Sequence, residues 1–238
     1  MRIFFLNCWR GKIDEAFLAF VQKYSPNTDV FCFQEFYSDL FSRFQKILKN
    51  HHGIYESGGI YKGDGLEYGQ AIFVKKEIDI ILSKKVSIVE DSMEWPGFLL
   101  YTRLDCKGKK LSLGNIHGIS PPGNKLDTDV RLKQSEKIIN FFADKDKPKI
   151  VGGDFNLLPN TESVSMFEKA GYRNLIKDFD IKNTRNKLSW EQFNRQPDFV
   201  KQYFADYVFV SPEIKVKKFD VPYMEISDHL PLILDFEV

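Results

Sequence analysis

Residues 149–156 read KIVGGDFN, and this stretch is the starting point for predicting the fold. The apolar residues at its start are typical of a short buried strand. The two glycines that follow allow a sharp turn of the backbone without a Cβ clash. This geometry delivers Asp154 and Asn156 to the carboxyl end of the strand, where α/β folds usually bind their ligands.

Asp154 and Asn156 allow two interpretations. A carboxylate next to a neutral amide can orient a water molecule and hydrogen-bond a phosphoryl oxygen. Asp and Asn are also ordinary turn and cap residues, so Asp154 could instead cap a helix near Pro159. The stretch by itself does not decide between a catalytic site and a structural turn.

The composition of the 238-residue chain limits its class. Hydrophobic residues make up 43% of the sequence, which is enough for a substantial core. No apolar run reaches the length of a membrane-spanning helix, so we expect no integral membrane association. The first residues leave no room for a signal peptide, and we therefore expect a cytoplasmic protein. Since neither a repeat nor a linker is visible, we expect one domain over residues 1–238.

Cysteine content and net charge narrow the possibilities further. The three cysteines, Cys8, Cys32 and Cys106, have no zinc-binding spacing, and their odd number fits reduced thiols. The formal net charge is only +1, whereas a dedicated nucleic-acid coat protein would be far more basic. A nucleic-acid enzyme remains compatible with this charge, because it needs only a locally positive groove.

The first 50 residues alternate between buried strands and helices. Residues 2–7 and 29–33 are strand-like, and apolar residues at helical spacing follow each of them. We expect Ser38 to cap the second of these helices. The strands end near Asn7 and Glu35, two residues that can bind a cation. If the strands are parallel, both side chains reach the same edge of the sheet.

The middle of the chain has a different pattern. It contains four strand-like segments separated by short turns: 68–74, 78–88, 98–104 and 110–116. The glycine-rich stretch 59–69 predicts a mobile loop at the edge of a substrate site. The last strand ends in His117, and a histidine in such a place is more often a structural hydrogen-bonding residue than a catalyst.

Further polar candidates lie on either side of the opening stretch. A helix with Arg131 near its first turn precedes it, and a short helix at 161–170 follows it. Residues 182–200 are polar and irregular and include Thr184 and Arg185. A loop of this kind beside a site often contacts ligand.

The last quarter of the chain contains a carboxylate in an apolar strand. Asp206 lies in this strand and needs a buried partner, because an unpaired carboxylate in a core is costly. Two more strand-like segments, 215–221 and 232–236, close the chain. Between them lies a polar motif that contains Asp228 and His229.

Six polar motifs follow one another in a specific order along the chain. They are Leu6-Asn7-Cys8-Trp9, Gln34-Glu35, Asn115-Ile116-His117, Gly153-Asp154-Phe155-Asn156, Asp206-Tyr207-Val208-Phe209-Val210 and Ser227-Asp228-His229-Leu230-Pro231. In this order the sequence resembles the endonuclease/exonuclease/phosphatase superfamily, which includes deoxyribonuclease I, exonuclease III and the neutral sphingomyelinases. The resemblance extends from residue 3 to residue 236. It implies an α/β fold, a deoxyribonuclease I-like four-layer α/β/β/α sandwich of two packed mixed β-sheets flanked by helices.

The resemblance also implies a metal site. Glu35 resembles the principal Mg²⁺ ligand of the family, Asn7 lies beside the same ion, and Asp228 resembles an additional acid of this site. Mg²⁺ suits such a place because it takes few protein oxygens and keeps waters and phosphate oxygens as its other ligands. We expect Mn²⁺ to be able to substitute.

Catalytic roles follow from the same resemblance. Asp154 resembles the residue that orients or deprotonates the attacking water, with Asn156 assisting it. His229 resembles the histidine that contacts the scissile phosphate, and Asp206 resembles its carboxylate partner. His117 resembles the histidine that hydrogen-bonds the phosphate or protonates the leaving oxygen. In addition, we expect substrate contacts from three residues: Arg131, Thr184 and Arg185.

The sequence therefore predicts a Mg²⁺-dependent hydrolase of phosphoester bonds. A phosphodiesterase acting on DNA or RNA, as an endonuclease or exonuclease, is slightly favoured over a hydrolase of a small-molecule or lipid-headgroup phosphoester. A catalytically silent phosphate-binding protein is the third alternative. It is disfavoured because Glu35, Asp154 and His229 are all present, and a full set of acid, base and metal groups rarely serves packing alone.

Overall fold

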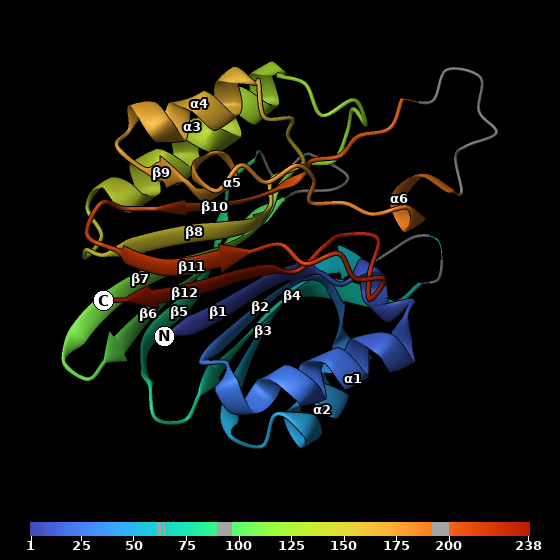
Figure 1. The fold of residues 1–238 in the computed structure, drawn as a ribbon, viewed down its shortest axis with the longest axis vertical. Helices are drawn as coiled ribbons and strands as arrows, with labels where there is room; N and C mark the ends of the chain where they lie inside the picture. The colour runs from blue at the N-terminus through green and yellow to red at the C-terminus, as the bar shows by residue number, and fades with distance from the viewer. Residues whose placement is uncertain (61–62, 64, 90–96, 192–199) are drawn as a thin grey trace.

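Two six-stranded mixed sheets pack face to face in the computed structural model, which describes residues 1–60, 63, 65–89, 97–191 and 200–238. Helices α1 (Asp14–Tyr24) and α2 (Ser38–Ile47) cover the outer face of one sheet. Helices α3 (Asp129–Ala143) and α4 (Glu162–Lys169) cover the outer face of the other (Figure 1). This four-layer α/β/β/α arrangement confirms the predicted fold class.

The first sheet has the strand order β11-β12-β1-β2-β4-β3. Its strands are β1 (Arg2–Asn7), β2 (Val30–Tyr37), β3 (His51–Ile60), β4 (Glu67–Lys75), β11 (Lys215–Asp220) and β12 (Leu232–Glu237). β1 and β2 are parallel, and Asn7 is paired with Gln34, the neighbour of Glu35. Asn7 and Glu35 therefore lie at the same level of the sheet, as the sequence predicts, although β2 continues past Glu35 to Tyr37.

The second sheet has the strand order β5-β6-β7-β8-β10-β9. Its strands are β5 (Asp79–Ser87), β6 (Phe98–Cys106), β7 (Lys109–His117), β8 (Lys149–Asp154), β9 (Arg173–Asn174) and β10 (Asp206–Val210). β7 is parallel to β8, and β10 is antiparallel to it. The register pairs His117 with Asp154 and Asp154 with Asp206, so three polar residues form one row across three strands.

The two sheets approach each other closely at β8. Gly152 lies there in regular extended backbone, and a Cβ on it would meet the ring of Phe5 at 2.7 Å. Gly153 has a φ of 127°, and a Cβ on it would lie 2.4 Å from the carbonyl oxygen of Ile116. The expected sharp turn at these glycines was therefore wrong. The strand continues to Asp154, and glycine is needed for close packing and for one unusual backbone conformation.

Several local expectations also need correction. Gly59 belongs to β3 and Gly69 to β4, so the predicted loop shortens to the segment between Ile60 and Glu67; residues 61, 62 and 64 lie outside the described part. Ser38 is the first residue of α2 rather than its cap, since Tyr37 holds the extended N-cap position. The sequence did not indicate β3 at all.

The helix after the GDFN motif is capped from a distant segment. Asp127, near the start of α3, accepts hydrogen bonds from the backbone N–H groups of Glu162 and Ser163 at 2.7 and 3.0 Å. These donors have no partner within the helix, so the carboxylate satisfies them. Asp154 is consequently not the cap of this helix, and its carboxylate is available elsewhere.

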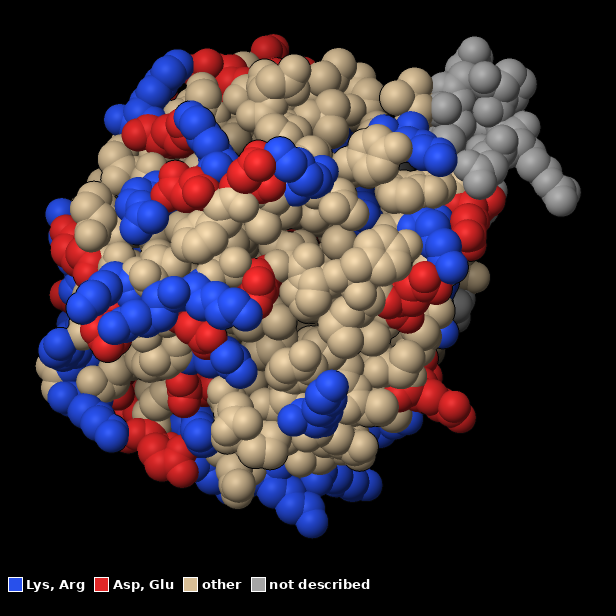
Figure 2. Space-filling model, in the orientation of Figure 1, with Lys and Arg blue, Asp and Glu red and all other residues tan. Residues whose placement is uncertain are grey.

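Neither sign of charge dominates the face of the molecule that is shown in Figure 2. On the face shown in Figure 2, Lys and Arg side chains alternate with Asp and Glu side chains. On the edge strand β11, Lys217 pairs with Glu237 at 2.8 Å, and Lys218 pairs with Asp220. Charges on an edge strand oppose pairing with another chain. In the described part of the chain, no helix is long and apolar enough to cross a membrane.

Candidate active site

The polar ends of β1, β2, β7 and β8 converge at one edge of the sandwich, with Asp154 in the middle. The Oδ2 atom of Asp154 accepts a hydrogen bond from the side-chain amide of Asn7 at 2.9 Å. The Nε2 atoms of His229 and His117 lie 3.8 and 3.9 Å from the same oxygen. Residues from both sheets and from four distant parts of the sequence thus meet around one carboxylate.

Glu35 reaches this site through a distortion of β2. The register of β2 shifts between Phe33 and Phe36, and Glu35 has a φ of 47°. Such a conformation in a residue with a side chain costs of order 1–3 kcal/mol and persists only where the surroundings enforce it. Here the backbone N–H of Cys8 donates to the carbonyl of Gln34 at 3.0 Å. The bulge turns the Glu35 carboxylate toward Asp154 and His117.

Asn7 connects the two acids. Its side-chain nitrogen donates to Glu35 Oε1 at 3.2 Å as well as to Asp154, while its Oδ1 accepts the backbone N–H of Trp9 at 3.0 Å. In this orientation the amide presents hydrogen-bond donors, and not its oxygen, to the two carboxylates. Asn7 lies beside the expected metal site but bridges two carboxylates in this structure.

His229 and Asp206 form a buried pair. The Nδ1 atom of His229 lies 2.9 Å from both carboxylate oxygens of Asp206, and both residues are almost fully buried. Asp206 therefore has the partner that its place in an apolar strand requires. Because Nδ1 faces this carboxylate, it carries a proton, and Nε2 faces Asp154.

Burial and neighbouring charges shift the pKa values of His229 and Asp154 in opposite directions. Burial lowers the pKa of His229, but the carboxylates of Asp206, Asp228 and Asp154 outweigh it and raise the pKa to about 9. Burial raises the pKa of Asp154, yet His229, Lys125 and other neighbours outweigh it and lower the pKa to about 2. Both shifts favour the charged forms, an imidazolium at His229 and a carboxylate at Asp154.

Asn156 is held in a fixed orientation next to Asp154. Its backbone N–H donates to Asp154 Oδ1 at 2.8 Å, and its φ is 54°. Its side-chain Nδ2 donates to the carbonyl of Gly118 at 3.2 Å, and its Oδ1 accepts a hydrogen bond from the ammonium group of Lys125. Both ends of the amide are therefore engaged.

Lys125 is a site residue that the sequence did not indicate. It is 6% exposed, and burial lowers the pKa of its ammonium group to about 8. It lies in the loop between β7 and α3, where one lysine among many gives no pattern. Only the tertiary structure brings it to Asn156.

The three residues expected to bind substrate lie in different surroundings. Arg131 is fully buried and donates to the carbonyls of Ser120, Pro122 and Leu126, so it braces that loop and does not face a ligand. Thr184 is also fully buried, and its hydroxyl oxygen accepts the N–H of Asp206 at 3.2 Å. Both side chains are therefore bonded within the protein itself, and contact of either with substrate stays a prediction.

Arg185 and Asp228 form an ion pair at the margin of the site. The Nη2 atom of Arg185 lies 3.1 Å from Asp228 Oδ2, and the other oxygen of Asp228 lies 4.0 Å from His229 Nε2. Arg185 keeps partial exposure, with 15% of its side chain accessible. It remains a candidate for contact with a phosphate, whereas one oxygen of Asp228 is already paired.

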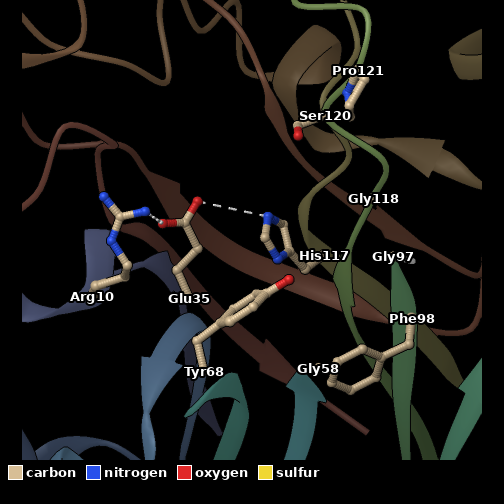
Figure 3. Close-up of a pocket in the computed structure, with 10 residues that line it drawn as sticks. All are labelled: Arg10, Glu35, Gly58, Tyr68, Gly97, Phe98, His117, Gly118, Ser120 and Pro121. Carbon is tan, nitrogen blue, oxygen red and sulfur yellow. Dashed lines mark ion pairs between the residues drawn. The ribbon is translucent and has the colours of Figure 1, made fainter. Parts of the chain in front are cut away.

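A pocket of about 200 Å³ opens beside the converging residues (Figure 3). Glu35 and His117 face each other across it, with Nε2 and Oε1 separated by 3.8 Å, and Arg10 lies on the far side of Glu35. Tyr68 and Phe98 form its aromatic part. The pocket therefore has a polar side formed by Arg10, Glu35 and His117 and an aromatic side formed by Tyr68 and Phe98.

Glu35 offers the ligand chemistry of a hard divalent cation. Its carboxylate is 23% exposed and borders the pocket, while Asp154 lies nearby behind Asn7. Mg²⁺ is typically bound through one or two carboxylates, with water and phosphate oxygens as its other ligands. The residues present therefore fit this ion. Asp154, Asp206 and His229 form a second group whose ligand atoms lie within 4.8 Å of one another.

The chain resembles known proteins both in its sequence family and in its fold. A family model described as the Endonuclease/Exonuclease/phosphatase family matches residues 5–229. Among curated protein sequences no significant match is found. A solved endonuclease/exonuclease/phosphatase family protein from Bacteroides thetaiotaomicron has a TM-score of 0.78 and 18% identity, covering 99% of this chain and 97% of that one.

Two further solved structures share this fold. D. rerio TDP2, complexed with single strand DNA product, has a TM-score of 0.78 and 16% identity, covering 100% of this chain and 99% of that one. A mannosyl-6-phosphatase from Bacteroides thetaiotaomicron has a TM-score of 0.72 and 18% identity, with 100% of both chains covered. At these identities the likeness establishes the architecture.

Proposed function

The chain belongs to the endonuclease/exonuclease/phosphatase family, and on that premise we propose that it is a Mg²⁺-dependent phosphodiesterase acting on nucleic acid. One observation carries the proposal. Asn7, His117 and His229 surround the ionised Asp154 within 4 Å, beside a partly exposed Glu35. This is the set of groups that attack of water on a phosphodiester requires.

Each residue has a role that follows from its position. Asp154, ionised and buried, orients the attacking water and accepts its proton. His229, held by Asp206 and protonated, binds a phosphate oxygen through Nε2, and His117 donates a hydrogen bond on the pocket side, next to the leaving oxygen. Asn7 keeps Glu35 and Asp154 at a fixed separation. A Mg²⁺ ion bound at Glu35 would neutralise charge on the phosphate.

Two solved structures of this fold bear on the substrate class. The complex of D. rerio TDP2 with a single-stranded DNA product has this fold, which supports a nucleic-acid strand as substrate. A second candidate is a sugar phosphate, because the pocket volume of about 200 Å³ suits one ring better than a polymer groove. The mannosyl-6-phosphatase of similar fold makes this candidate concrete.

A substrate panel tests the proposal directly. Single-stranded and duplex DNA, RNA, bis-p-nitrophenyl phosphate and a sugar 6-phosphate would be incubated with the protein and Mg²⁺. We expect the protein to cleave at least one of the nucleic acids and bis-p-nitrophenyl phosphate. Both rates should be far above the rate for the sugar 6-phosphate, which is a monoester. Release of inorganic phosphate from the monoester alone would replace the nuclease proposal with the phosphatase candidate.

Hydrolysis should slow as the pH rises through about 9, because the pKa of His229 is raised to about 9 and its proton is then lost. Below that pH the imidazolium persists and binds the phosphate. The ion pair of His229 with Asp206 also stabilises the fold. This contribution is complete below a pH of about 6.5, the pKa of a histidine in the unfolded chain, and it is lost as the pH rises through about 9, the pKa of His229 in the folded protein. Asp206→Asn removes the main carboxylate partner and should move the alkaline limb of the kcat profile to lower pH. An unmoved limb would assign it to another group.

A further inference from the structure

We propose that Lys125 is a built-in second cation: its ammonium group supplies the positive charge that a second metal ion would bring to the Asp154 side of the site. The enzyme would then work with one divalent cation, bound at Glu35. This inference rests on the proposed phosphodiesterase function and concerns how the same site is charged.

The first support is the place of the ammonium group. Lys125 is 6% exposed, and its Nζ donates to Oδ1 of Asn156, whose backbone N–H in turn donates to Asp154. Asn156 carries no charge, so it cannot balance a buried ammonium group by itself. Burial lowers the pKa of Lys125 to about 8 and Arg185 adds to this effect, whereas attraction to the carboxylates of Asp154 and Asp206 favours the charged ammonium group. A buried cation persists only where such groups compensate the loss of water.

The second support is the backbone that presents this lysine. Lys125 has a φ of 58°, a conformation that costs energy in a residue with a side chain. Its carbonyl accepts the N–H of Leu158 at 2.9 Å, and Arg131 donates to the carbonyls of Pro122 and Leu126 at 2.6 Å each. The loop is therefore fixed on both sides of Lys125. The fold enforces a strained residue at this point, as is common at functional sites.

The third support is the balance of buried charge. Three carboxylates, those of Asp154, Asp206 and Asp228, are 1–5% exposed. Three cationic groups accompany them: His229 lies 2.9 Å from Asp206, Arg185 lies 3.1 Å from Asp228, and Lys125 is linked to Asp154 through Asn156. A divalent ion placed among Asp154, Asp206 and His229 would add two positive charges to a group that is already balanced. Glu35 lies at the edge of the pocket, 3.8 Å from Arg10, and is the partly exposed carboxylate that we assign to the metal.

Counting bound ions tests the inference without relying on catalysis. The EDTA-treated protein would be titrated with Mn²⁺ and followed by calorimetry and by the electron paramagnetic resonance of free Mn²⁺. We expect one ion per chain in the wild type. In Lys125→Met we expect a second ion to bind and the hydrolysis rate to depend on the square of Mg²⁺ concentration. At low Mg²⁺, where the second site is empty, the rate should be lower by about 100-fold, as loss of one group that stabilises transition-state charge produces.

The control is Lys133→Met, which removes an exposed lysine from α3 and should leave one ion and an unchanged rate. Two ions on the wild type would overturn the inference, as would one ion and a wild-type rate in Lys125→Met. If Lys125→Met does not fold, Lys125→Arg, which retains the charge, must still bind one ion. Ion counts need no substrate. A wild-type protein that binds one ion but does not hydrolyse phosphodiesters would therefore refute only the proposed function and not the inference about Lys125.

Discussion

Asp154→Asn should lower kcat for bis-p-nitrophenyl phosphate by at least about 10³-fold, because it removes the proposed base at the centre of the site. The substitution replaces a buried anion whose pKa is lowered to about 2 with a neutral amide of the same shape. It also places a second NH₂ group opposite the amide of Asn7, which now donates to Asp154 Oδ2 at 2.9 Å. Steady-state kinetics at saturating Mg²⁺ would measure the loss.

The fold should survive this change. One carboxamide oxygen can still accept the N–H of Asn156, which now bonds to Oδ1 at 2.8 Å, and the volume is unchanged. Circular dichroism and the thermal midpoint would establish that the variant is folded. Asp180→Asn, at a carboxylate that is 83% exposed, is the matched control and should keep full activity. Turnover at the wild-type rate in Asp154→Asn would remove this residue from the mechanism.

Removal of divalent cations should abolish hydrolysis, and Mg²⁺ or Mn²⁺ should restore it. Glu35 offers the partly exposed carboxylate for the ion, so Glu35→Gln should need at least about 100-fold more Mg²⁺ for half-maximal rate. Loss of even an outer-shell partner costs about 10–100-fold in metal affinity or activity, and loss of a ligand should cost no less. The measurement is the rate against Mg²⁺ concentration after exhaustive dialysis against EDTA.

Two comparisons make the metal experiment decisive. Glu237→Gln changes an exposed acid that is ion-paired on β12, far along the strand from the site, and should leave the Mg²⁺ dependence unaltered. A rate that persists in EDTA-treated protein would exclude Glu35 as the ligand of an essential ion. Restoration by Mg²⁺ with an unaltered half-maximal concentration in Glu35→Gln would place the ion elsewhere.

Buried strands were the part of the fold that could be predicted from sequence. Lys149–Asp154 and Val30–Tyr37 contain continuous apolar runs because both of their faces are covered, and such runs are visible without any structure. β3 was missed because it is an edge strand, paired only with β4, with half-exposed residues and three glycines. Its pairing with β4 defines it, and pairing is a tertiary property.

Part of the candidate site could likewise be predicted from sequence, and part could not. Asn7 and Glu35 could be placed together, because parallel strands bring their carboxyl ends to one edge. The requirement of Asp206 for a partner also followed from its apolar surroundings, and His229 meets it. By contrast, a sequence does not show whether a basic side chain will be buried. Arg131 was expected at the substrate and braces a loop, while Lys125 was overlooked and donates to Asn156 in the site.

The row formed by His117, Asp154 and Asp206 limits how the chain can diverge. These residues occupy matching positions on β7, β8 and β10. Adding or deleting one residue within any of these strands would shift one member by about 3.3 Å and turn its side chain to the opposite face. Inside the three strands, replacements preserve the row, whereas an inserted residue does so only where a β-bulge absorbs it. Length variation among relatives should be confined to the connecting loops, such as that between His117 and α3.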